Sequence, residues 1–481
     1  MDTFLHLLNG GAGNLAAYLA AHVLLCLLPA FFIAGAMTAL IPKASITRWL
    51  GRNAPYRVSY PAAAAAGSLL AVCSCTIVPL FAGIYKKGAG LGPAITFLFF
   101  APAGNVLALA YTGSILGAEF AFARFVLCLL FGIGIGLSMA LLFWRDDARH
   151  DAATDTLFAE QARIGPAATG VLLALVAVLI AGTLKVSLLT TTVATATLPL
   201  PWAEAWQATL LRWVPFDATK GEEGVSVQGS LLIGLLLLIG VAAWKGLEDI
   251  VEGANRWTWA ALALAAATLL VAALRLTAGP AGLEVSITGR TLAVGLALGA
   301  VWFQARRLDP EAWRAWLWES WRFVKQIFAL LVAGVFVVGI VRQLIQPEWI
   351  QALAGRNDLL ANAVAVVFGV FMYFPTLVEV PVAHMFLDLG MHRGPLLAYL
   401  MADPELSLQS ILMVAAVIGR PKTFTYVGLV ALFSVVAGLL YGAWVDGVNP
   451  GWIAGGLLAF MGSLAALLTW MLARRAAPAR A

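Results

Sequence analysis

Long apolar segments, separated by short polar connections, run through most of this chain. A helix needs roughly 18 or more apolar residues to cross a hydrocarbon core of about 30 Å, and several segments reach that length. The clearest of them lie at 118–143, 166–189, 229–245, 257–277 and 452–472. This pattern predicts an all-α polytopic membrane protein.

Weaker segments complete a predicted set of about eleven full spans. They lie at 15–41, 91–111, 284–304, 323–345, 394–418 and 424–445. The span at 284–304 is the weakest, because Glu284 and Arg290 interrupt it. Basic residues favour cytoplasmic loops, and their distribution places the N-terminus outside and the C-terminus inside.

Two stretches rich in proline and glycine recur with a constant spacing of 302 residues. The matched pairs are Pro79 with Pro381, Gly88 with Gly390, Gly92 with Gly394, Pro93 with Pro395, Leu98 with Leu400, Pro102 with Pro404 and, upstream, Gly67 with Gly369. Duplication with interrupted helices is typical of transporters whose site lies between repeats. The predicted topology puts an odd number of crossings between the first helices of the repeats, so the repeats are expected to be inverted.

Two further apolar segments, 58–85 and 359–388, are predicted to be re-entrant hairpins. If the first crossed the membrane instead, Lys86 and Lys87 would lie outside, against the basic-residue rule. The alternative is an ordinary span. Irregular backbone is tolerated at membrane depth only where protein or water covers it, so the two hairpin tips are expected near each other at mid-membrane.

These elements divide the chain into four predicted regions. They are repeat 1 with its C-x-C hairpin (1–143), a cytoplasmic loop and connecting transmembrane helices (144–320), repeat 2 (321–445), and a last transmembrane helix with a basic tail (446–481). Within the second region, 144–165 is expected to be a polar loop, and 203–213 an amphipathic helix at the membrane interface. Tryptophans near 313–321 are expected to form an interfacial belt rather than a ligand site.

Composition agrees with this class and excludes others. Hydrophobic residues make up 62% of the chain and charged residues 11%, against about 25% charged in soluble domains. The net charge of +5 is scattered over short loops, so no nucleic-acid partner is expected. Nucleotide, haem and HExxH zinc motifs are missing from the sequence, so neither a cofactor nor enzymatic activity is expected.

The C-S-C sequence at the first hairpin tip is the most distinctive chemical feature. Residues two apart on a helix point in nearly opposite directions, so Cys73 and Cys75 converge only where the chain is unwound. Paired thiolates prefer soft species such as Cu(I) and, by the same chemistry, trivalent arsenic. The alternative is that they are small buried apolar residues, which is the expectation for Cys26 and Cys128.

Repeat 2 carries carboxylates where repeat 1 has none. Glu379 stands at the position of Ile77, and Asp403 and Glu405 flank Pro404. A carboxylate deep in a membrane is costly and therefore a functional candidate, and burial favours its protonated form, which suits proton coupling. The alternatives are a backbone amide that satisfies Glu379 and a helix cap formed by Asp403 or Glu405.

The predicted site residues follow from the hairpin tips and the helix breaks. Substrate binding is assigned to Cys73, Ser74, Cys75, Pro79, Pro102, Asn105, Pro375, Thr376, Pro381, Pro404 and Ser407. Proton coupling is assigned to Glu379, Asp403 and Glu405, and metal binding to Cys73 and Cys75. The alternative is that the prolines only kink packed helices.

Two motifs carry a resemblance to a known family. They are CSCTIVPLFAGIYKKGAGLGPAITFLFFAPAGN at 73–105 and FPTLVEVPVAHMFLDLGMHRGPLLAYLMADPELS at 374–407. With their flanking helices, at roughly 15–143 and 321–445, the chain resembles the ArsP-type permease family (UPF0718 or DUF318 predicted permeases). The resemblance implies a multi-pass permease of the bacterial inner membrane, and some such permeases export trivalent organoarsenicals.

The expected function is therefore secondary-active efflux of a soft, thiol-reactive solute such as a trivalent organoarsenical, coupled to protons. The expected partners are that solute and the lipid bilayer. Efflux of a metal ion such as copper or zinc is the first alternative. A membrane thiol-disulfide relay and an accessory subunit without transport are alternatives from other classes.

Overall fold

A computed structural model describes residues 2–20, 23–41, 43–52, 54–69, 74–157, 165–184, 186–215, 224–280, 282–342, 348–371 and 376–476. The chain forms two compact units, each built from separated stretches. Unit 1 contains residues 1–45, 71–87 and 161–343, and unit 2 contains residues 46–70, 88–160 and 344–481. The units interleave along the sequence, and the linear division into repeats stays a prediction.

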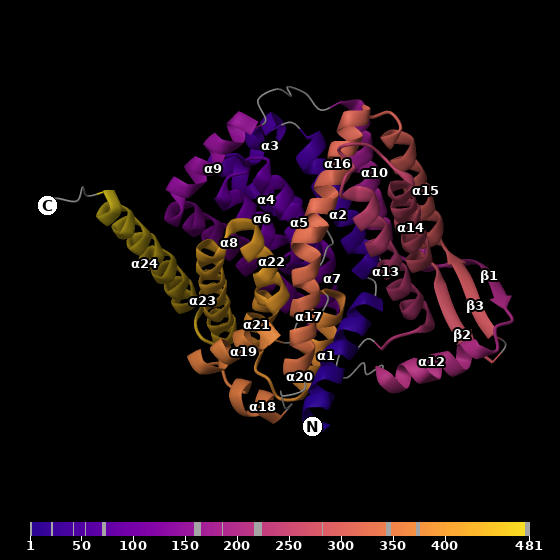
Figure 1. Cartoon of the computed structure of the whole chain (residues 1–481). Coiled ribbons are helices and arrows are strands. Elements are labelled where there is room, and N and C mark those ends of the chain that lie inside the picture. Colours follow the sequence, from indigo (N-terminus) through magenta and orange to yellow (C-terminus); the bar gives the residue numbers. More distant parts are fainter. Residues whose placement is uncertain are drawn as a thin grey trace. The chain divides into compact units, whose positions relative to one another are not determined.

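Unit 1 is a helical bundle with one small sheet (Figure 1). Its helices are α1 (Asp2–Ala20), α2 (Val23–Leu40), α5 (Ser74–Lys86), α10 (Pro166–Thr183), α11 (Ser187–Thr190), α12 (Trp202–Trp213), α13 (Val227–Leu247), α14 (Arg256–Ala273), α15 (Gly289–Ala305), α16 (Pro310–Phe323), the π-helix η1 (Val324–Phe328) and α17 (Ala329–Arg342).

The core of unit 1 forms where small residues let helices approach closely. Ala242 and Ala243 of α13 pack against Ala261 of α14 and Trp321 of α16. Gly246 lies against the backbone of α14, where a side chain would not fit. Such close contacts between small residues are typical of membrane helices, whose association cannot rely on hydrophobic burial.

Three antiparallel strands form the sheet, in the order β1 (Thr192–Leu198), β3 (Gly282–Thr288) and β2 (Arg275–Gly279). Figure 1 shows this sheet next to the amphipathic helix α12, which was expected at 203–213. The predicted span at 284–304 begins too early, because GLEVSIT alternates like a strand and Glu284 pairs in the sheet. The helix at this place, α15, begins at Gly289.

Three other expected boundaries are also wrong. The span expected at 15–41 begins too late, because helix α1 already begins at Asp2, with α2 following at Val23–Leu40. The interfacial helix and the span expected at 323–345 form one helical segment, which passes through η1 without a break. The polar loop expected at 144–165 is helical over α9 (Trp144–Leu157), since its charges suit an exposed helix as well as a loop.

In the described part of unit 2, helices make up all of the regular elements apart from one isolated β-bridge between Gly51 and Ala89. Its helices are α3 (Lys43–Leu50, whose first residues belong to unit 1), α4 (Tyr56–Leu69), α6 (Leu91–Ala103), α7 (Val106–Ile115), α8 (Ala118–Leu142), α9, α18 (Glu348–Ala354), α19 (Leu359–Phe371), α20 (Thr376–Asp388), α21 (Arg393–Leu406), α22 (Leu408–Ile418), α23 (Arg420–Val445) and α24 (Pro450–Ala476).

The predicted hairpins consist of short helices. The helices α4, α5, α19 and α20 contain 14, 13, 13 and 13 residues. At 1.5 Å per residue each is about 20 Å long, which is less than a hydrocarbon core of about 30 Å. The tips at 70–73 and 372–375 lie outside the described residues, so the re-entrant path stays a prediction.

Matched positions of unit 2 make matched contacts. Gly67 lies against the backbone of Ala101, and Gly369 lies in the same way against Asp403, 302 residues further on. Positive φ angles recur at the same spacing, in the turns at Gly88 and Gly390 and before α8 and α23 at Gly117 and Gly419. A duplication predicts these matched contacts, while the inverted orientation of the repeats stays a prediction.

Among the described residues, eight helices are long and apolar enough to cross a membrane, or nine if the bent pair α21–α22 forms one span. The chain is thus a mostly helical, multi-pass membrane protein. The count of eleven spans stays a prediction.

Candidate functional site

The first helix break lies at Gly104–Asn105, between α6 and α7. Pro102 stands in the last turn of α6, which ends at Ala103, and Asn105 caps the start of α7. Its side-chain Oδ1 accepts a hydrogen bond from the backbone N–H of Ala108 at 2.8 Å, and its Nδ2 donates to the carbonyl oxygens of Ala101 and Pro102 at 3.0 Å. The Asn105 amide, predicted to bind substrate, therefore stabilises the break in this structure.

The second helix break lies at Ser407, where α21 and α22 meet at an angle of 47°. Pro404 stands in the last turn of α21, as Pro102 does in α6. Because proline cannot donate, the carbonyl oxygen of Leu400, four residues earlier, has no helical partner. The Ser407 hydroxyl is buried and donates to the Ser410 hydroxyl at 2.8 Å.

Arg124 of α8 donates hydrogen bonds to carbonyl groups that lack a helical partner at both breaks. Its side chain is completely buried. Its Nε donates to the Ala103 carbonyl oxygen at the end of α6 at 3.0 Å, and its Nη2 donates to the Leu400 carbonyl oxygen at 3.3 Å. One guanidinium thus satisfies the backbone of two interrupted helices.

The same guanidinium forms a buried ion pair with Glu379 of α20. Arg124 Nη2 lies 2.9 Å from Glu379 Oε1, and both side chains have 0% exposure. Arg124 Nη1 also donates to the Thr112 hydroxyl at 3.1 Å, and that hydroxyl donates in turn to the Ala108 carbonyl oxygen. We call Arg124, Thr112, Glu379 and the two carbonyl groups the Arg124 site.

The ion pair is costly to bury, and its contacts reduce that cost. Removing two charges from water is compensated only if further hydrogen bonds satisfy both groups. Arg124 makes four hydrogen bonds, but Glu379 Oε2 has no hydrogen-bond partner among the described residues. The Arg124 site therefore keeps one carboxylate oxygen able to accept a proton or a ligand.

A second buried acid lies further along α21. Glu405 is 3% exposed, and its Oε2 accepts a hydrogen bond from the Tyr426 hydroxyl of α23 at 2.5 Å. Its Oε1 has no hydrogen-bond partner in the part of the chain that the structure describes. Tyr426 stands 302 residues after Arg124, so the two partners of buried acids occupy matched positions. We call Glu405 and Tyr426 the Glu405 site.

The two sites are close along one helix. Leu400 and Glu405 are five residues apart on α21, which corresponds to about 8 Å along its axis. Asp403, the third predicted acid, lies between them and has 0% exposure. All three acids predicted for proton coupling are thus buried in unit 2, where Glu379 pairs with Arg124 and Glu405 accepts a hydrogen bond from Tyr426.

The other predicted residues are placed unevenly. Pro79 is buried in α5, and Pro102 and Pro404 are buried at the breaks. Two predicted site residues, Cys73 and Pro375, lie outside the described residues. For four others the structure describes only the backbone; these are Ser74, Cys75, Thr376 and Pro381. Over the side chains that the structure does describe, no group of three His, Cys, Asp or Glu residues could hold a metal ion.

Cys128 lies beside the first break. It is buried, as expected, but its Sγ is 3.7 Å from the carbonyl oxygen of Ala103, which also accepts from Arg124. The sequence reading of this thiol as a purely apolar residue is therefore incomplete.

Sequence reasoning missed Arg124 and Tyr426. The signal for Arg124 was present, since it is the basic residue within the apolar run at 118–143, and an ionisable residue in a span is a functional candidate. Tyr426 follows from Arg124 by the constant spacing of 302 residues. Nothing in the sequence alone indicates that they bind Glu379 and Glu405.

Comparison with known proteins agrees with this architecture. The ArsP_1 family, described as a predicted permease, matches residues 9–443. The UPF0718 protein MJ0584 of Methanocaldococcus jannaschii is 31% identical over 456 residues, which cover 92% of this chain and 98% of that protein. No solved structure matches the chain. The polytopic helical fold and the match over nearly its whole length show that the chain belongs to the ArsP_1 family of predicted permeases.

Proposed function

We propose that this permease is a secondary transporter in which the Arg124 and Glu405 sites couple solute movement to proton movement. The observation that carries the proposal is the buried guanidinium of Arg124, which binds two interrupted helices and a carboxylate at once. Ionisable groups inside membrane proteins mark substrate and ion pathways, and interrupted helices supply the backbone groups of such sites.

In this proposal Arg124 is the fixed charge. Arginine stays protonated in proteins, so the guanidinium cannot carry the coupling proton. It neutralises Glu379 and satisfies the carbonyl groups of Ala103 and Leu400. A change in the angle at either break would alter these bonds, which connects the ion pair to the helix movements of alternating access.

Glu405 is the exchangeable proton site of the proposal. Its described partner is a neutral hydroxyl, that of Tyr426, and not a cation. A buried carboxylate without a counter-ion is costly, so Glu405 is protonated while it is closed off and loses its proton when water reaches it. Glu379 and Asp403 are the other acids through which a proton would pass.

The solute in this proposal is a soft, thiol-reactive species such as a trivalent organoarsenical, exported across a bacterial inner membrane. Support comes from the family, from the C-S-C sequence of Cys73 and Cys75, and from the preference of thiolates for soft species. The relative from Methanocaldococcus jannaschii is archaeal, so the membrane type rests on the sequence resemblance alone.

Proteoliposomes provide the test. An imposed pH gradient is expected to stimulate methylarsenite flux through the wild-type chain, and Glu405→Gln is expected to transport at one rate with and without the gradient. Glu119→Gln is the matched control, because Glu119 lies at an exposed end of α8 and bonds to Trp444. Gradient dependence that survives in both Glu405→Gln and Glu379→Gln would refute the coupling role.

The same vesicles test the solute. Replacing Cys73 and Cys75 together by serine is expected to abolish methylarsenite flux. If Cu(I) or Zn²⁺ is carried and methylarsenite is not, the chain is a metal-ion permease. If the double variant transports methylarsenite, Cu(I) and Zn²⁺ as fast as the wild type does, Cys73 and Cys75 do not bind the solute.

A further inference from the structure

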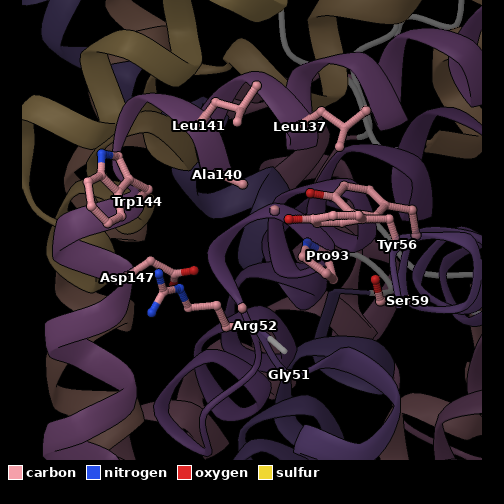
Figure 2. Close-up of a pocket in the computed structure, with 13 residues that line it drawn as sticks. Gly51, Arg52, Tyr56, Ser59, Pro93, Leu137, Ala140, Leu141, Trp144 and Asp147 are labelled. Atoms are coloured by element: carbon pink, nitrogen blue, oxygen red, sulfur yellow. The ribbon is translucent and has the colours of Figure 1, made fainter. Parts of the chain in front are cut away.

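A cavity of about 550 Å³ lies in unit 2, away from both helix breaks. Its walls come from the connection before α4, from α4 itself, from the first turn of α6, from the end of α8 and from α9 (Figure 2). The proposed transport function uses none of these surfaces. Pockets of roughly 300–1,000 Å³ commonly bind small organic molecules.

The walls of the cavity are mostly apolar and aromatic. Figure 2 shows Leu137 and Leu141 of α8 on one side, with Tyr56 and Pro93 facing them and Trp144 at the end of the same wall. Aromatic side chains of this kind can stack on the ring of a ligand. They do not suit a bare metal ion, which needs several oxygen, nitrogen or sulfur ligands.

Two buried hydroxyl groups in the lining have no hydrogen-bond partner among the residues that the structure describes. Ser59 is 1% exposed and Tyr60 is 2% exposed, and neither hydroxyl has a hydrogen bond within the described residues. The Tyr60 hydroxyl lies against Cα of Gly92, another lining residue, where any side chain would collide with it. A buried hydroxyl without a partner costs free energy, so a ligand that bonds to it is favoured.

The charges at the cavity compensate each other. Arg52 and Asp147 lie on the same side of the cavity in Figure 2. Asp147 Oδ1 also accepts a hydrogen bond from the backbone N–H of Leu91, at the start of α6, at 2.9 Å. Neither sign of charge is in excess, so the lining favours an uncharged ligand over an anion or a cation.

We propose that this cavity is a second binding site, which takes an uncharged, ring-containing organic molecule with one hydroxyl group bonded to Tyr60 or Ser59. The site is separate from the Arg124 site, because α6 runs for 13 residues, about 18 Å, between Leu91 and the carbonyl group of Ala103. A bound ligand would contact the N-terminal end of α6, whose other end accepts a hydrogen bond from Arg124.

Binding of 2-naphthol to the full chain in nanodiscs tests the proposal without using transport. Equilibrium dialysis against empty nanodiscs is expected to show saturable binding of 2-naphthol. Naphthalene, which has no hydroxyl, and 2-naphthoate, which is charged, are expected to bind at least tenfold more weakly. Stronger binding of 2-naphthoate would identify an anion site instead and overturn the proposal, as would a lack of saturable binding.

Two variants place the ligand. Tyr60→Phe is expected to weaken 2-naphthol binding about five- to tenfold, the effect of one lost hydrogen bond, and to leave naphthalene binding unchanged. Ala140→Phe fills the cavity and is expected to abolish both. Tyr441→Phe on α23 is the control and is expected to bind like the wild type. Unchanged 2-naphthol binding in both Tyr60→Phe and Ala140→Phe would place the ligand elsewhere and refute the site.

Discussion

Arg124 and Tyr426 stand at matched positions of α8 and α23, yet they treat their buried acids differently. Arg124 gives Glu379 a permanent positive charge and also binds two backbone carbonyl groups. Tyr426 gives Glu405 one hydrogen bond and no charge. Matched positions of the two helices thus provide a cationic partner for one buried acid and a neutral hydroxyl partner for the other.

Removing Arg124 is expected to have the largest effect. Arg124→Ala leaves Glu379 buried without its counter-ion and two carbonyl groups without donors, which costs about 3–5 kcal/mol. We expect the apparent Tm to fall strongly and transport to stop. Arg124→Leu combined with Glu379→Leu should recover much of the stability but no transport. Recovery of transport in the double variant would show that the ion pair is only structural.

Lys87 sharpens the comparison, because the matched residue in repeat 2 is Leu389. Burial lowers the pKa of Lys87 to about 8 from 10.5, and the charge of Glu319 offsets this only in part. Between these two pH values the unfolded chain binds more protons, so stability rises with pH through that window. Below pH 8 the folded protein carries the whole penalty.

Lys87→Leu removes that penalty, which is at most about 3 kcal/mol. We expect a higher apparent Tm at pH 7 and a flatter dependence of Tm on pH between 8 and 10.5. Arg149→Leu, at a basic residue with an 83% exposed side chain, is the control. A variant whose pH dependence equals that of the wild type would show that Lys87 is not the group responsible.

Gly117 and Gly419 stand at matched turns, before α8 and before α23, where substitutions are expected to have equal effects on stability. They have φ angles of 102° and 85°, and a Cβ at either position would meet no neighbour within 4 Å. Gly117→Ala and Gly419→Ala are therefore expected to cost the same, about 1–3 kcal/mol, from backbone strain alone. Gly428→Ala, in the interior of α23, should instead be neutral or stabilising. Unequal losses at the matched glycines would argue against equivalent turns.

Tyr426→Phe is expected to have the smallest effect on stability. It removes one hydrogen bond, worth about 1 kcal/mol, and leaves Glu405 without a described partner. The informative measurement is proton coupling, since the pH at which flux is half-maximal should shift while the Arg124 site stays intact. A shift in Tm with no change in the pH profile would make Tyr426 a packing residue.

Much of this arrangement could be predicted from the sequence, because the constant spacing of 302 residues marks turns and breaks directly. It located Pro102 and Pro404, and it identified the acids Glu379 and Glu405 as exceptions to the apolar pattern. The small sheet was not predicted, because β1 pairs with β3, which is far away in the sequence, and no local pattern connects them.

The partners of the buried acids could not be predicted in the same way. Arg124 and Glu379 are 255 residues apart, and no local pattern connects residues at that distance. Their contact depends on how α8, α20 and α21 pack together in the fold, which the sequence alone does not give. An arginine in an apolar run was therefore visible, but its acid was not.

The bonds of Arg124 to the ends of α6 and α21 also bear on leakage. Arg124 donates hydrogen bonds to both interrupted helices. A large tilt of α6 or of α21 alone would therefore break one of these bonds. Movement of α6 without α21 is therefore less favourable than a movement of both helices together. If the proposed proton coupling holds, this double attachment of Arg124 would hinder proton leakage in the absence of solute.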